Sequence, residues 1–93
     1  MTRIEVACAP ELDGWSCTVE VIEAGSRSRH AVRVRADDLA RLDPAAGDPR
    51  DLVRRSFEFL LDRESKESIL ASFDLMVISR YFPAYEADVG RRP

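Results

Sequence analysis

The chain has 93 residues, of which 45% are hydrophobic and 33% are charged, and its formal net charge at pH 7 is −3. This length favours one domain with a single hydrophobic core. The negative net charge weighs against general binding to nucleic acid or to an anionic membrane surface. The sequence holds no apolar run of about 18 residues, so we expect no membrane-spanning helix.

The N-terminal segment lacks the apolar stretch of a signal peptide. We therefore expect a cytoplasmic location. In that compartment, Cys8 and Cys17 would be reduced.

Three segments, at about 3–9, 14–24 and 27–36, alternate apolar and polar side chains. Such period-2 alternation is typical of strands with one buried and one exposed face. The turn between the first two segments lies at residues 10–14. We predict an antiparallel three-stranded β-meander whose inner face carries Ile4, Val6, Cys8, Trp15, Cys17, Val19, Val21, His30, Val32 and Val34.

The two connections of the meander bear on its register. In the first hairpin two registers are open, with Cys8 either directly opposite Cys17 or diagonal to it. In the second hairpin, Gly25 and Ser26 favour a two-residue turn. The pairs predicted from that turn are Val21 with His30, Val19 with Val32, and Cys17 with Val34.

Helices are predicted from residue 37 onward. Asp37 can begin a short helical turn to about residue 42, and residues 43–47 then break it. Asp48 and Pro49 suit the first positions of a helix over about 49–63. Its polar face carries the carboxylates of Glu58 and Asp62, which we interpret as a solvated, ion-paired surface.

Two shorter helices are predicted after this long one, at about 66–72 and 74–82. Asp74 can cap the second, and Pro83 ends it. Two or three C-terminal helices would then pack on one face of the meander in an α+β fold. We expect a single domain over residues 1–86 and a flexible tail over residues 87–93.

Candidate chemistry is sparse. His30, the only histidine, is expected on the inner face and is interpreted as structural. Cys8 and Cys17 are interpreted as small buried hydrophobic residues; the alternatives are a cross-strand disulfide, a redox pair or, with His30, part of a metal site. No phosphate loop, nucleophile elbow or HExxH motif is present, so we predict no catalytic residue, no metal and no cofactor.

Two surfaces are candidates for interaction. Arg29, Arg33 and Arg35 share the exposed face of the third strand, where cross-strand pairing with carboxylates is the main interpretation. Guanidinium groups also suit a phosphate or an acidic partner, although this face lacks aromatic residues for stacking bases. The second candidate is the aromatic end of the last helix, which either anchors the core or forms an interface: Tyr81, Phe82 and Tyr85.

The segment from residue 56 to residue 85 reads SFEFLLDRESKESILASFDLMVISRYFPAY. Its pattern, SFxFLLxRE…SIL…FDxxVI…YFPxY, resembles that of a family of short uncharacterised bacterial proteins. The resemblance implies a bacterial origin and a single domain with a strand-rich N-terminal half, and it implies no particular activity.

The leading expectation is a non-enzymatic module that acts through a protein partner or through self-association. An exposed first strand makes a homodimer one form of that expectation. The alternatives are a nucleic-acid-linked regulator, similar to an antitoxin, that uses the arginine face, and a small enzyme that uses a thiol or His30.

Overall fold

The computed structural model describes residues 1–90 of the chain. Three long strands come first: β1 (Arg3–Glu11), β2 (Gly14–Glu23) and β3 (Ser26–Arg35). Each pairs antiparallel with the next, which confirms the predicted meander. A fourth, three-residue strand, β4 (Ser72–Asp74), pairs parallel to β3, so the sheet order is β1-β2-β3-β4.

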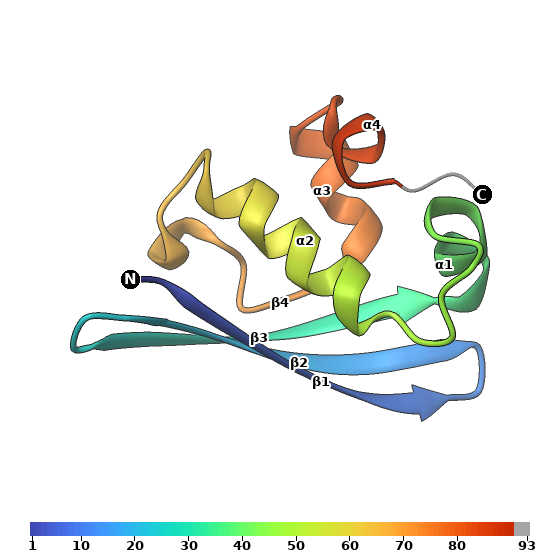
Figure 1. Ribbon diagram of the computed structural model, residues 1–93, viewed down its shortest axis with the longest axis horizontal. Coiled ribbons are helices and arrows are strands. Elements are labelled where there is room, and N and C mark those ends of the chain that lie inside the picture. Colours follow the sequence, from blue (N-terminus) through green and yellow to red (C-terminus); the bar gives the residue numbers. More distant parts are fainter. Residues whose placement is uncertain (91–93) are drawn as a thin grey trace.

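The helices all lie on one side of this sheet (Figure 1). The chain turns through α1 (Ala36–Leu42) and then α2 (Arg50–Leu61), the longest helix. The N–H of Arg50 donates to the Asp48 carboxylate at 3.0 Å, which gives Asp48 the capping role that the sequence predicted. The α+β class, with helices covering one face of a meander, is thus confirmed.

The remaining helical segments are short: η1 (Lys66–Ser68), η2 (Leu75–Val77), α3 (Ile78–Tyr81) and α4 (Tyr85–Val89). The predicted helix over 66–72 was wrong, because only a three-residue turn forms before the chain becomes extended. Nucleating so short a helix is costly, and here the backbone joins the sheet instead. The Ala31 N–H donates to the Ala71 carbonyl at 2.8 Å, and β4 follows.

The predicted helix over 74–82 is present in two pieces, η2 and α3. Asp74 caps it as expected, since its carboxylate accepts from the Met76 N–H at 3.0 Å. The expected tail differs, because α4 forms after Pro83 and its Val89 side chain is buried. Residues 91–93 of that predicted tail lie outside the described part of the chain.

The register of the second hairpin was predicted wrongly by two residues. Glu23 pairs with Ser26, so the turn residues are Ala24 and Gly25. Gly25 takes the left-handed φ of +72° at the second turn position, where glycine meets no steric penalty. Because a shift of two residues preserves the side-chain faces, the inner face is still the predicted one. The observed opposing pairs are Val19 with His30, Cys17 with Val32, Trp15 with Val34 and Val21 with Ser28.

The core lies between the inner face of the sheet and α2. Phe57 of α2 is fully buried, and its ring centroid lies 5.3 Å from that of His30 and 6.1 Å from that of Phe73. Burying a side chain of this size contributes about 1.5–3 kcal/mol. Phe57 therefore joins the meander to the C-terminal segment. Within residues 1–90, no helix is long and apolar enough to cross a membrane.

Candidate functional site

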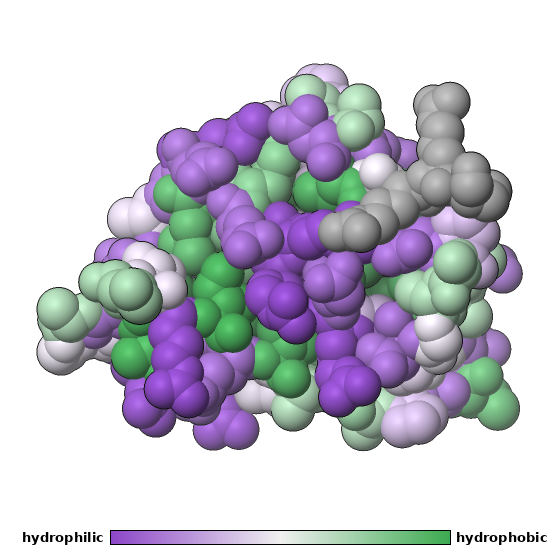
Figure 2. Space-filling model, in the orientation of Figure 1, coloured by the Kyte–Doolittle hydropathy of each residue, from purple (hydrophilic) through white to green (hydrophobic). Residues whose placement is uncertain are grey.

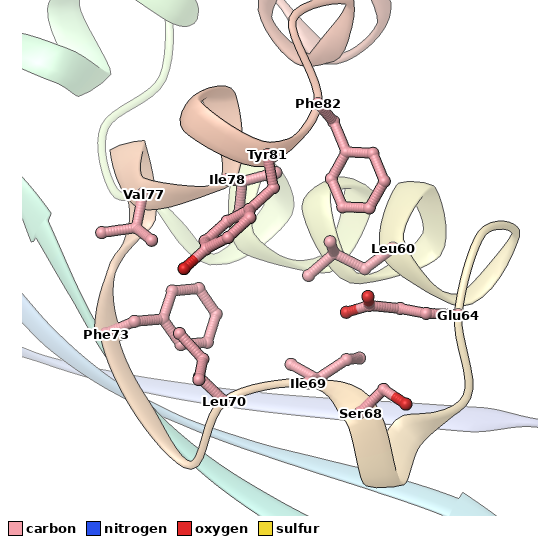
Figure 3. Close-up of a pocket in the computed structure, with 10 residues that line it drawn as sticks. All are labelled: Leu60, Glu64, Ser68, Ile69, Leu70, Phe73, Val77, Ile78, Tyr81 and Phe82. Atoms are coloured by element: carbon pink, nitrogen blue, oxygen red, sulfur yellow. The ribbon is translucent and has the colours of Figure 1, made fainter.

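A pocket of about 390 Å³ opens beside α3. We call it the α3 pocket. It lies between the C-terminal end of α2, the segment that follows α2, and the chain from β4 to Phe82 (Figure 3). Its walls are mainly apolar, and they include Leu60, Ile69, Phe73, Ile78 and Phe82.

Two aromatic side chains of the pocket wall are held in place by contacts with rings of the core. Phe73 contacts Phe57, and Phe82 meets Phe59 edge-on at a centroid distance of 5.8 Å. Edge-to-face contacts of this kind hold ring orientation as well as position. Pro83 follows directly and cannot continue α3. The pocket is therefore built on positioned side chains.

Glu64 brings a charge to this apolar site. Its side chain extends into the pocket from the turn that follows α2 (Figure 3). The Glu64 N–H donates to the Leu60 carbonyl at 2.8 Å, which ties the residue to the helix end. Within residues 1–90, its half-buried carboxylate has no ion pair and accepts no hydrogen bond from a side chain.

The nearest basic side chains in the sequence are engaged elsewhere. Arg63 stacks on the Phe59 ring, with its guanidinium carbon 3.5 Å from the ring centroid, and it also pairs with Asp88 at 3.2 Å. The Lys66 ammonium group is almost fully buried and pairs with Glu67 and, at 3.6 Å, with Glu23. The hydrogen bond with the Glu67 carboxylate is the main cause that raises the pKa of Lys66 above its usual value. The ammonium group therefore stays charged beside Glu67.

The rim of the α3 pocket exposes two large hydrophobic side chains. Tyr81 is 69% exposed and Leu70 is 50% exposed. Tyr81 and Phe82, two of the three aromatic residues predicted for interaction, thus line one pocket. The third, Tyr85, is fully buried, so it adds nothing to an exposed surface.

Tyr85 instead anchors α4 to α2. Its hydroxyl lies 2.6 Å from the hydroxyl of Ser56, which in turn donates to the Leu52 carbonyl. Desolvation raises the pKa of Tyr85 to about 12, because burial penalises the phenolate. Its role is structural.

His30 also has a structural position, as predicted. It is 3% exposed, and its Nδ1 donates to the Leu70 carbonyl at 2.8 Å. Its Nε2 lies 2.8 Å from the hydroxyl of Ser28. Both ring nitrogens are therefore in use, and His30 ties the sheet to the segment that carries the pocket rim.

The expectation of reduced cysteines was wrong. Cys8 lies directly opposite Cys17, which settles the register left open by the sequence, and the two form a disulfide. The alternative of a metal site made from these thiols and His30 is thereby removed. Among the described residues, no group of three or more potential ligands is placed to hold a metal ion.

The arginines of the sheet occupy the predicted exposed face. Arg33 lies 3.7 Å from Glu11, and Arg35 lies 3.4 Å from Asp74. Cross-strand charge pairing therefore accounts for both. Arg29 has no ion pair with any of residues 1–90.

Sequence reasoning missed Glu64, Leu70 and Phe73 as pocket residues. No local signal in the sequence separates Glu64 from the helix-surface carboxylates Glu58 and Asp62. It is singled out only because α2 ends at Leu61, so that the next residues turn back over the helix end.

Comparison of the chain with protein-family models, with curated proteins and with solved structures finds no match. The resemblance to short bacterial proteins therefore stays a prediction.

Proposed function

We propose that the protein is a non-enzymatic interaction module that anchors a partner protein in the α3 pocket. The partner would contribute an apolar side chain next to a lysine or arginine. The observation that carries this proposal is the Glu64 carboxylate, which reaches into an apolar pocket and has no ion pair within residues 1–90.

The chemistry of such a site favours a cation. A carboxylate near apolar groups loses hydration, and a positive group at hydrogen-bond distance offsets that cost. The aromatic and aliphatic walls would take the apolar part of the same ligand. Exposed Tyr81 and Leu70 extend the contact around the rim, and tyrosine is among the residues that contribute most at interfaces.

The non-enzymatic part of the proposal rests on how the reactive groups are used. Both nitrogens of His30 are occupied, and Cys8 and Cys17 are joined to each other. Neither group faces the α3 pocket as a free nucleophile or base, since no lining residue is a histidine or cysteine.

The test is photo-crosslinking in the native host, with the crosslinker placed at Leu70. We expect one partner to be captured, and capture to fall at least tenfold when Tyr81→Ala or Glu64→Gln is added. Arg29→Ala, on the opposite side of the sheet, is the matched control and should leave capture unchanged. Equal capture by the pocket variants and the control would contradict the proposal.

A nucleic-acid-linked role has less support. Arg33 and Arg35 are paired with carboxylates, and the net charge is −3. A gel-shift titration at low salt separates the two roles, because binding through phosphates weakens steeply as salt is added. We expect no shift of DNA or RNA.

The cellular location is open to the same kind of test. The expected cytoplasmic location stays a prediction, whereas the Cys8–Cys17 disulfide favours an oxidising compartment. Alkylation of thiols in intact cells distinguishes them. Labelled cysteines support the cytoplasm, and protected cysteines support an oxidising compartment.

A further inference from the structure

The first strand, β1, forms an open edge of the sheet. It pairs with β2 along nine residues without a bulge, and within residues 1–90 β2 is its only neighbour in the sheet. The opposite edge differs, because β4 has only three residues and continues directly into η2. Among the described strands, β1 is the one whose whole length has no neighbour on its outer side, whereas β3 is covered by β4 at Ala31–Arg33 and is open before it.

The residues that face this open edge can be identified. The Cα atoms of Cys8 and Cys17 are 4.0 Å apart, a separation typical of a non-hydrogen-bonded antiparallel pair. The N–H and C=O groups of Cys8, and of Ile4 and Val6 at even spacing, therefore point away from β2. Pro10 belongs to the same set, and its missing N–H costs the β1–β2 ladder nothing.

This edge carries few of the features that usually block strand addition. The inward-facing side chains Ile4, Val6 and Cys8 are apolar and only partly buried. Hydrophobic surface is visible on the front of the molecule, where β1 runs below the charged side chains of α2 (Figure 2). Pro10 stands near the far end, and Glu5 is the only charged side chain between Ile4 and Cys8.

A groove of about 520 Å³ separates β1 from the start of α2. Its floor includes Ile4 and Val6. Its other wall carries two acidic and two basic side chains, Asp48, Asp51, Arg50 and Arg54. With no net charge, this wall selects neither an acidic nor a basic peptide.

We propose that the occupant of this edge is β1 of a second copy, paired antiparallel about a two-fold axis at Ala7. In this register Val6 lies opposite Cys8 of the second copy, and about six backbone hydrogen bonds form. On the outer face, Arg3 meets Glu11 of the second copy, twice in the dimer. This charge complementarity favours a second copy over an unrelated strand.

The ion pairs that Arg3 and Glu11 make within one copy compete only weakly with the proposed interchain ion pairs. Arg3 lies 2.6 Å from Glu5, and Glu11 lies 3.7 Å from Arg33, but all four side chains are at least 40% exposed. Exposed pairs of this kind contribute little. A shift of the register by two residues in one direction would place Arg3 opposite Ala9 and forfeit both interchain ion pairs. A shift in the other direction would place Glu5 opposite Glu11, which brings like charges together.

Two alanines on the exposed face of β1 provide a matched test. In the proposed register Ala7 faces itself, whereas Ala9 faces Glu5 of the second copy. Ala7→Lys therefore brings two ammonium groups together and should raise the dimer Kd about tenfold. Ala9→Lys meets a carboxylate and should lower the Kd or leave it unchanged. Both alanines are exposed, so circular dichroism should show both variants folded.

The measurement is analytical ultracentrifugation of the full chain from micromolar to millimolar concentration. Arg3→Glu should weaken the dimer about tenfold, and adding Glu11→Arg should restore it. Amide hydrogen exchange gives a second readout: the amides of Ile4 and Val6 should gain protection with concentration, whereas that of Ala7, already paired with β2, should not. Glu64→Gln should leave self-association unchanged, so this test is independent of the α3 pocket.

A chain that stays monomeric at every concentration would overturn the proposal. So would a dimer in which the Ile4 and Val6 amides stay unprotected. If Ala9→Lys weakens the dimer and Ala7→Lys strengthens it, the proposed register is wrong.

Discussion

The meander of residues 3–35 and the segment of residues 62–90 differ in what holds their backbones. The meander has three strands of nine or ten residues, each bonded continuously to its neighbour. The C-terminal segment has helices and a strand of only three to five residues each. Elements this short are not stable alone, so they depend on side-chain contacts with α2 and, for β4, on the short backbone pairing with β3. The candidate site lies in the segment that depends on such contacts.

The largest expected effect comes from removing the residue that joins the two regions. Phe57→Ala deletes the ring between His30 and Phe73 and should lower the free energy of unfolding by about 3–5 kcal/mol. Urea denaturation followed by circular dichroism measures this loss. A single transition is expected, because the C-terminal segment has no core of its own. Two separate transitions would contradict this dependence.

Removing the disulfide measures the stability that it gives to the meander, because both cysteines lie in β1 and β2. It closes a short loop, with nine residues of sequence separation. Replacing both cysteines by alanine should therefore lower the free energy of unfolding by about 2–3 kcal/mol. Denaturation with and without a reducing agent provides the control, since the variant should not respond to reduction. Capture of a partner at the α3 pocket should be unaffected by this change. A loss of capture would mean that the meander and the C-terminal segment are coupled through β1.

Tyr85 makes the C-terminal segment sensitive to alkaline pH. Its pKa is raised to about 12 in the folded protein, against about 10 in the unfolded chain. Below pH 10 both states keep the proton and the stabilisation is complete. Between about pH 10 and pH 12 only the unfolded state releases it, so about 2–3 kcal/mol of stability is lost.

Denaturation at a series of pH values compares the wild type with Tyr85→Phe. The variant should lose its hydrogen bond with Ser56 but should lack this part of the alkaline decline. An identical decline in both proteins would assign it to other groups.

The smallest expected effect on stability comes from Glu64. Because its carboxylate has no ion pair within residues 1–90, Glu64→Gln should change the free energy of unfolding by no more than about 0.5 kcal/mol. Asp43→Asn is the contrasting variant, since Asp43 pairs with Arg55 at 2.7 Å where both side chains are largely buried. It should be clearly destabilising. A comparable loss for Glu64→Gln would indicate a structural role instead of a binding role.

The same contrast explains which features could be predicted from the sequence. Alternation along β1, β2 and β3 is a local signal, so the faces of the meander and the burial of His30 were correct. The Asp48-Pro49 start of α2 is local as well. The register of the β2–β3 hairpin was harder to predict, because Gly25 can serve at either central position of a two-residue turn. Both choices place the same side chains on the same faces of the sheet.

The missed features depend on contacts between distant residues. Strand β4 exists because residues 71–74 lie beside β3, and apart from Phe73 their composition does not favour a strand. The disulfide needed the β1–β2 register, which two turn geometries left open. Tyr85 could not be assigned to the core or to an interface, because its partner Ser56 is 29 residues away. Glu64 became a candidate only once the end of α2 and the position of η1 were known.

The hydrogen bond between His30 and the Leu70 carbonyl has a practical consequence. Since the chain has one histidine, its imidazole gives a single set of nitrogen signals in NMR spectra. The Nδ1 proton is buried and held by the rim of the α3 pocket, so its chemical shift reads out the position of that rim. The protein thus carries an intrinsic spectroscopic probe with which ligands of the pocket can be screened, and affinities titrated, without any introduced label.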